Sequence, residues 1–215
     1  LTGLSSGGQM IRYVPVSDIL GRGAMTKVAI WCRHKGDNII GIGPHIPWHV
    51  KSDFRRFRRI TTGQALAAGQ KTYESFPGRT LPDRRIFVLT PEENYEVSDP
   101  EKHFVVNDVR FFKDFEEDLY IVGGATIYKL FMTGGAKLMP EIVVDCVYDG
   151  ELKAGLEGEP VTITSCVEVL NKNYRQISAD YELDGITTRV LVRRGEFVDQ
   201  SVLKHIVGAI EEGMD

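Results

Sequence analysis

Cysteine is scarce in this sequence, and long hydrophobic runs are missing from it. The three cysteines, Cys32, Cys146 and Cys166, form no CxxC pair, which argues against a zinc site and against a disulfide framework. Such a set favours reduced thiols in a cytoplasmic protein. No apolar run reaches the roughly 18 residues of a membrane span. The first residues, LTGLSSGGQ, show neither the charged start nor the apolar stretch of a secretory signal.

An excess of basic residues is also lacking. The 215 residues include 26 Lys and Arg against 30 Asp and Glu, a net charge of −4, so no general nucleic-acid-binding surface is expected. The five histidines do not cluster, and no metal site is expected. With 42% hydrophobic and 26% charged residues, the chain has the composition of an ordinary globular protein.

Short apolar runs alternate with helix-like stretches along most of the chain. Several runs are almost entirely apolar, which predicts strands that are covered on both faces. The alternation predicts an α/β fold with a mostly parallel sheet. The last runs have no helix between them, so the C-terminal strands are expected to be antiparallel. The predicted strands are 27–32, 65–69, 85–90, 103–108, 118–124, 141–148 and 187–194, and the predicted helices are 51–61, 71–76 and 124–133.

Three segments divide the chain. Residues 1–24 are expected to be an N-terminal extension, and residues 25–195 the compact domain, because its first predicted strand follows Met25. In residues 196–215, apolar residues from Val202 to Ile210 recur at helical spacing and predict an amphipathic C-terminal helix. That helix could pack on its own chain or on a partner, and the first alternative is favoured.

The predicted helix 51–61 carries one notable acid, Asp53. Ser52 is expected to cap the helix, while Phe54, Phe57 and Ile60 form its buried side and the four arginines face water. Asp53 lies one turn before Phe57, on the same inward side. It is either a partner of the helix dipole or a functional acid, and spacing alone favours the dipole.

Two glycine turns join strands to helices. Gly69 precedes Gln70 and Lys71, and the pair Gly123 and Gly124 precedes another helix start. Free N–H groups at such starts could bind the phosphates of a dinucleotide, but many such turns are only tight connections. Neither turn is a GxGxxG fingerprint. Arg84, at the mouth of a strand, could clamp a carboxylate or could be a surface charge.

Taken in order, these segments resemble dihydrofolate reductases, from about Met25 to Gly195. The similarity is strongest in IIGIGPHIPWHVKSDFRRFRRIT, GQKTYESFPGRTLPDRRIFVLT and LYIVGGATIYKLF. It implies a three-layer fold and reduction of 7,8-dihydrofolate to 5,6,7,8-tetrahydrofolate by NADPH, with hydride transfer to C6 and protonation at N5. It also implies inhibition by methotrexate or trimethoprim. We expect a monomer or homodimer and, from the charge balance and the lack of long apolar runs, no nucleic-acid or membrane partner.

The resemblance also implies roles for individual residues. Asp53 becomes the acid that binds the pterin ring, and Trp48 helps to hold a water beside it. Residues 36–46 match a mobile loop, and the paired glycines carry a cis peptide bond in this family. The implied substrate-binding residues are Ile30, Phe54, Phe57, Arg84, Val122 and Tyr128. The implied cofactor-binding residues are Ile40, Gly69, Gln70, Lys71, Thr72, Leu89, Thr90, Gly123, Gly124, Ala125, Thr126 and Ile127.

Two departures from the family pattern stand out. Gln70 takes the place of an arginine that often meets the cofactor's 2′-phosphate, so Lys71 and Thr90 are the expected substitutes. Asp145 falls where a threonine usually bridges the acid to the substrate, which would place two carboxylates together and raise at least one of their pKa values. A shift of one residue would place Val144 there instead.

Two other readings remain open at this point. One is a reductase of the same fold that acts on a pyrimidine precursor of riboflavin, although the Pro-Trp…Asp…Phe stretch and Arg84 speak against it. The other is a catalytically weak protein that binds a nucleotide or folate, for which Gln70 and Asp145 are the support.

Overall fold

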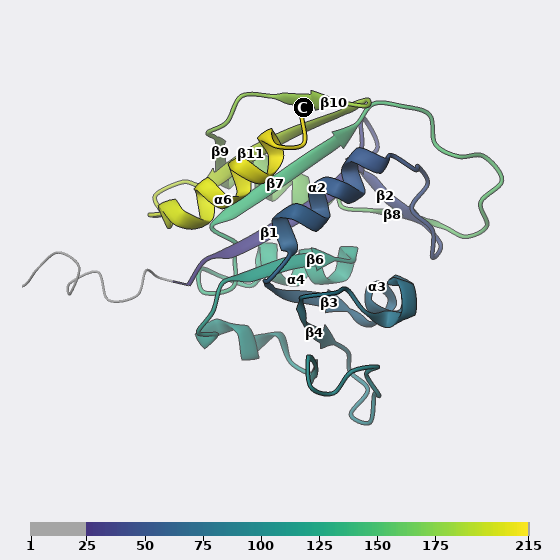
Figure 1. Ribbon diagram of the computed structural model, residues 1–215, viewed down its shortest axis with the longest axis vertical. Coiled ribbons are helices and arrows are strands. Elements are labelled where there is room, and N and C mark those ends of the chain that lie inside the picture. Colours follow the sequence, from purple (N-terminus) through teal and green to yellow (C-terminus); the bar gives the residue numbers. More distant parts are fainter. Residues whose placement is uncertain (1–24, 215) are drawn as a thin grey trace, which may run out of the picture.

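A computed structural model describes residues 25–214 of the chain, and a twisted sheet forms its centre (Figure 1). Nine strands of the described residues join in the order β10-β11-β7-β1-β6-β3-β4-β5, with β9 paired to β11. The pairs from β7 to β5 are all parallel, whereas β9, β10 and β11 pair antiparallel. The strands are β1 (Lys27–His34), β3 (Ala65–Gly69), β4 (Arg85–Leu89), β5 (His103–Val106), β6 (Leu119–Gly123), β7 (Ile142–Tyr148), β9 (Tyr174–Gln176), β10 (Tyr181–Leu183) and β11 (Ile186–Arg193).

Helices cover both faces of this sheet and complete three layers. One face packs against α2 (Lys51–Thr61), α3 (Gln70–Ser75) and α6 (Gln200–Glu211), and the other against α4 (Ala125–Thr133) and α5 (Thr164–Asn173). Each face has its own apolar core, because neighbouring residues of the strands point to opposite sides. The expected mostly parallel, three-layer α/β fold with antiparallel C-terminal strands is therefore confirmed.

The apolar runs predicted as strands are all found, and the three predicted helices are present within a residue of their expected bounds. Several short elements were not predicted. β2 (Ile39–Ile42) pairs with β8 (Pro160–Thr162) in a separate two-stranded sheet, and helix α5 was also missed. The pairing of β2 with β8 joins segments about 120 residues apart, which local sequence patterns do not reveal. The short helices η1 (Pro77–Arg79) and η2 (Val109–Asp114) complete the described elements.

Helix α2 has the predicted bounds but turns a different side toward the sheet. Its buried side follows Ser52, Arg56 and Ile60 at intervals of four residues, whereas Phe54 is 43% exposed. The expectation that all four arginines face water is wrong for Arg56. Val50, not Ser52, is the N-cap, because the helix begins at Lys51 and Ser52 lies inside its first turn, where it is buried. This rotation buries Arg56, which lies beside Asp53 because residues three apart are neighbours on a helix surface.

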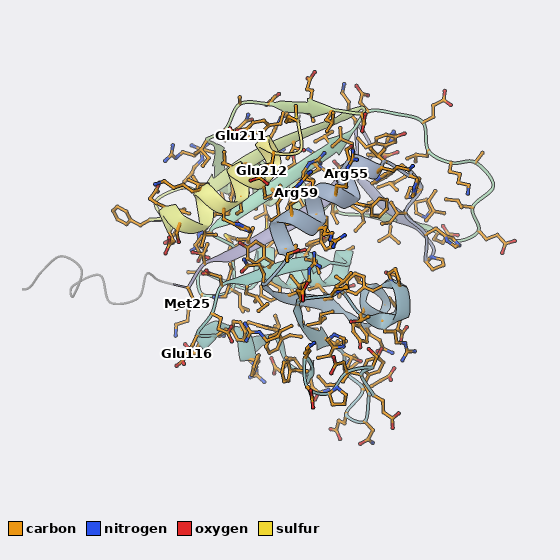
Figure 2. The ribbon with its side chains drawn as sticks, viewed as in Figure 1. Met25, Arg55, Arg59, Glu116, Glu211 and Glu212 are labelled. Atoms are coloured by element: carbon orange, nitrogen blue, oxygen red, sulfur yellow. The ribbon has the colours of Figure 1, made fainter. Side chains whose placement is uncertain are left out.

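The tail of the chain forms helix α6, which packs against α2 of the same chain (Figures 1 and 2). Val202, Ile206 and Ile210 are buried in the core that α2 also contacts. The His205 imidazole Nε2 lies 2.9 Å from the Ile60 carbonyl oxygen, near the end of α2. The tail helix therefore covers the sheet beside α2. The N-terminal extension expected over residues 1–24 lies outside the described residues.

Candidate active site

Asp53 lies at the inner edge of α2 with 19% of its side chain exposed. Its Oδ1 is 3.3 Å from Nη1 of Arg56, and the Cys32 thiol near the end of β1 also hydrogen-bonds to the carboxylate. Burial raises the pKa of Asp53, and the positive charge of Arg56 opposes that rise without cancelling it. The site therefore holds a carboxylate that is shielded from water and still reachable.

The carboxyl ends of β1 and β6 meet next to helix α4. The Tyr128 hydroxyl, carried by α4, donates a hydrogen bond to the Ile30 carbonyl oxygen of β1. Val122 is buried at the end of β6, in the same core as Ile30. Gly123 follows with φ +114°, and a Cβ atom there would lie 3.1 Å from the Tyr128 hydroxyl. Three of the predicted substrate-binding residues thus lie close together.

The two glycine turns lie side by side. A Cβ atom on Gly69 would approach Cγ1 of Ile127 to 2.9 Å, and one on Gly124 would approach Oγ1 of Thr72 to 3.3 Å. The turn after β3 and the turn after β6 therefore touch, with Ala125 and Thr126 at the start of α4. Exposed N–H groups at this helix start can bind an anionic group. The Gly123–Gly124 peptide bond is cis, as the resemblance implied.

Gln70 is held at the start of α3 by polar neighbours. Its Oε1 accepts a hydrogen bond from the Thr90 hydroxyl at 2.6 Å, just beyond Leu89 of β4. Its Nε2 donates to Glu74 at 3.3 Å and to Glu92 at 3.1 Å. Two carboxylates therefore lie beside Gln70, which takes the position where the resembled family often has an arginine. Lys71 is exposed on the same short helix.

Trp48 and Arg84 are both buried at the ends of α2. The Trp48 ring lies 5.2 Å from that of Tyr148, and its Nε1 has no hydrogen-bond partner among the described residues. The water that the resemblance implies beside this N–H group stays a prediction. The Arg84 guanidinium donates to the Thr61 hydroxyl and to main-chain carbonyls of Pro82 and Arg58, so its direction is fixed. Of the remaining expected residues, Ile40 and Phe57 are partly buried, and Phe54 is exposed.

Asp145 does not face Asp53, and the expectation of two neighbouring carboxylates is wrong. Asp145 pairs with Trp31 in the sheet, and its side chain lies on the opposite face from Asp53. It accepts hydrogen bonds from Trp31 Nε1 at 2.6 Å and from Arg33 Nε at 2.8 Å. Cys146, the next residue, points toward Asp53 instead. Because side chains of a strand alternate between the two faces of the sheet, an alignment shifted by one residue places the wrong side chain beside Asp53.

Sequence reasoning missed Arg56 and Cys146. Arg56 is only 6% exposed, and its Nη1 lies 3.3 Å from the Cys146 sulfur as well as from Asp53. The spacing of Asp53 and Arg56, three residues apart on one helix, was the available signal.

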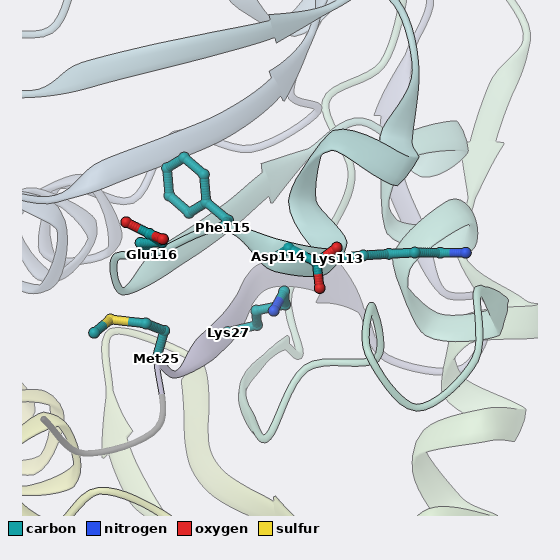
Figure 3. Close-up of a pocket in the computed structure, with 6 residues that line it drawn as sticks. All are labelled: Met25, Lys27, Lys113, Asp114, Phe115 and Glu116. Atoms are coloured by element: carbon teal, nitrogen blue, oxygen red, sulfur yellow. The ribbon is translucent and has the colours of Figure 1, made fainter. Parts of the chain in front are cut away.

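A surface hollow of about 500 Å³ lies elsewhere on the molecule (Figure 3). Lys27, which begins β1, lines it, whereas Cys32 beside Asp53 lies near the other end of that strand. The hollow is therefore separate from the candidate site. Its lining is Met25, Lys27, Lys113, Asp114, Phe115 and Glu116. Residues 25–214 bring together no trio of His, Cys, Asp or Glu that could hold a metal ion. None of the helices in this range is long and apolar enough to cross a membrane.

Comparison with known proteins gives consistent results. The family model of dihydrofolate reductase matches residues 27–151. Dihydrofolate reductase from Enterococcus faecium is 29% identical over 130 residues, which is 60% of this chain and 77% of that protein. The Mycoplasma genitalium dihydrofolate reductase is 31% identical over 122 residues, covering 54% of this chain and 75% of the relative. The solved structure of the Enterococcus faecalis enzyme, complexed with NADP(H) and RAB-propyl, superposes with a TM-score of 0.62 at 19% identity. This match covers 79% of this chain and 96% of the other.

Proposed function

Since the chain belongs to the dihydrofolate reductase family, we propose that it reduces 7,8-dihydrofolate with NADPH at the site around Asp53. The observation that carries this assignment is the half-buried carboxylate on α2, beside the converging ends of β1 and β6. A flat heterocycle with adjacent N–H donors can place two hydrogen bonds on such a carboxylate. The match to the dihydrofolate reductase family speaks against the riboflavin-precursor reading.

Several residues would hold the substrate around this acid. The main-chain carbonyl of Ile30 and the side chains of Val122 and Phe57 would flank the pterin ring. Arg84 would pair with the carboxylate of the substrate's glutamate tail, because its guanidinium is already oriented by Thr61. Trp48 would orient a water beside Asp53 through its free indole N–H. Phe54, which is exposed, would contact the part of the substrate that extends outward.

The touching glycine turns fit the cofactor. When bound, NADPH supplies the hydride that reaches C6 of the substrate. The absence of a Cβ at Gly69, Gly123 and Gly124 lets the two turns pack closely against Ile127, Tyr128 and Thr72. The free N–H groups at the start of α4 would then bind the cofactor's phosphates. Tyr128, tied to Ile30, would form one wall of the nicotinamide pocket. Leu89 and Thr90 would lie along the adenosine end, next to Gln70 and Lys71.

Asp53 would favour the reaction electrostatically. A fixed negative charge in a pocket that excludes water stabilises the positive charge that develops when N5 is protonated. The proton itself would arrive through water, because the carboxylate binds the ring on the side away from N5. Three free cysteines agree with a cytoplasmic location, where thiols stay reduced.

The test replaces the carboxylate by its neutral isostere. Asp53→Asn should lower turnover near neutral pH by roughly 100-fold to 1,000-fold, the usual effect of removing one electrostatic stabiliser. The assay follows the loss of NADPH absorbance with dihydrofolate present, and NADPH binding is measured separately by fluorescence. Asp114→Asn is the control, because Asp114 is exposed beside the distant hollow. Unchanged turnover of Asp53→Asn would refute the assignment.

A further inference from the structure

Arg56 is a buried cation within the site that the mechanism above does not use. It lies one turn after Asp53 on α2, and only 7% of its side chain is exposed. Nη1 contacts both Asp53 Oδ1 and the Cys146 sulfur at 3.3 Å. A buried arginine is rare unless it is paired. Here its carboxylate partner is the same group that is proposed to bind the substrate.

The other ionisable groups that face this pair are neutral near pH 7. Burial raises the pKa of Cys146 to about 11 and raises the pKa values of Cys32 and Tyr128 as well. Asp145, the nearest acid on β7, lies on the opposite face and is paired with Arg33. Among the described residues of α2, β1 and β7 that face this pair, Asp53 and Arg56 are thus the two that carry a charge. Together they carry no net charge.

We propose that Arg56 is a specificity-determining residue whose guanidinium, in contact with Asp53, makes the site discriminate against positively charged ligands. This inference rests on the proposed function, because it takes Asp53 as the group that binds the heterocycle. The contact with Arg56 uses Oδ1, and the carboxylate keeps acceptor capacity on Oδ2 for ligand N–H groups.

The discrimination follows from charge. A neutral ring, such as that of dihydrofolate, gains hydrogen bonds to Asp53 and meets no net repulsion. A basic ring that binds in its protonated form is attracted by Asp53 and repelled by the Arg56 guanidinium, which lies 3.3 Å from that carboxylate. Like charges brought close in a shielded site weaken binding strongly, so Arg56 selects against the cation.

The experiment compares a neutral with a basic ligand in matched variants. The basic probe is trimethoprim, a 2,4-diaminopyrimidine, and the neutral ligand is dihydrofolate. Arg56→Met should tighten trimethoprim inhibition by about tenfold or more, while KM for dihydrofolate changes by less than about threefold. Arg56→Lys keeps the charge and should behave like the unmodified protein. Arg55→Met is the control, because Arg55 is exposed on the same helix (Figure 2).

A second readout is independent of turnover. The pKa of Asp53 is measured by ¹³C NMR of the labelled carboxyl group, and it should rise by about one unit or more in Arg56→Met. Should Arg56→Met fail to fold, Arg56→Gln keeps a hydrogen-bond donor without the charge and should show the same two shifts. Equal changes in trimethoprim and dihydrofolate binding, or an unmoved Asp53 pKa, would overturn the inference. Normal turnover of Asp53→Asn would instead refute the proposed function on which this inference rests.

Discussion

Asp145 provides a test of how much a buried charge pair stabilises this fold. Its carboxylate is 3% exposed and accepts two hydrogen bonds from Arg33, whose side chain is 13% exposed, and one from Trp31. Breaking a buried ion pair costs about 3–5 kcal/mol. Asp145→Asn keeps an oxygen for Trp31, and Arg33 can reach some water. We therefore expect the free energy of unfolding to fall by an amount at the lower end of this range, about 3 kcal/mol.

Urea unfolding measures this loss directly. With a slope of about 2 kcal/mol per molar urea for a domain of this size, the midpoint should fall by about 1.5 M. The control is Asp149→Asn, since Asp149 forms an ion pair with Lys35 in which both side chains are 62% exposed. That variant should lose about 0.5 kcal/mol and shift the midpoint by about 0.25 M. Equal shifts in the two variants would refute the argument that burial makes the Asp145 pair important.

Three further predictions concern the site. Gly123→Ala should lower stability and turnover more than Gly135→Ala, because both have positive φ but only the first Cβ would meet Tyr128; unfolding and NADPH-consumption assays compare them. Gln70→Arg should raise the preference for NADPH over NADH by about tenfold, measured as the ratio of kcat/KM, since it places a cation near the 2′-phosphate. Burial raises the pKa of Asp53, so dihydrofolate affinity should fall, as pH is lowered, at a higher pH than the ordinary value of about 4; a fluorescence titration should lack this fall in Asp53→Asn.

The central strands were predictable because their sequences are nearly all apolar. A run such as Ala65–Gly69 has every residue buried, and a strand covered on both faces needs that composition. The shorter pair β2 and β8 was not predictable in the same way. The two strands include Gly41 and Pro160, which are unfavourable in strands. Each strand is stabilised by pairing with a distant segment and not by an alternating hydrophobic pattern of its own.

The candidate site was predictable in its residue types but not in its detailed packing. The motifs around Asp53, Gly69 and Gly123 indicated which segments meet, because they occur in a known order. The side of α2 that faces the sheet was predicted wrongly, since Arg56 counts as polar in any hydrophobic pattern. Its burial depends on Asp53 and on Cys146, 90 residues away.

Helix α2, which carries Asp53 in its first turn, is also held at its other end. His205 of α6 lies against the carbonyl of Ile60, one of the last carbonyls of α2, which have no partner within the helix. In a second contact between the two segments, the guanidinium of Arg59 on α2 lies beside Gly213, just after α6 ends. Both contacts involve helix ends, and α6 lies beyond the residues 27–151 that match the family model. The chain therefore supports its acid-bearing helix with a segment outside the matched region, and a carboxylate on a rigid element keeps its orientation toward a ligand.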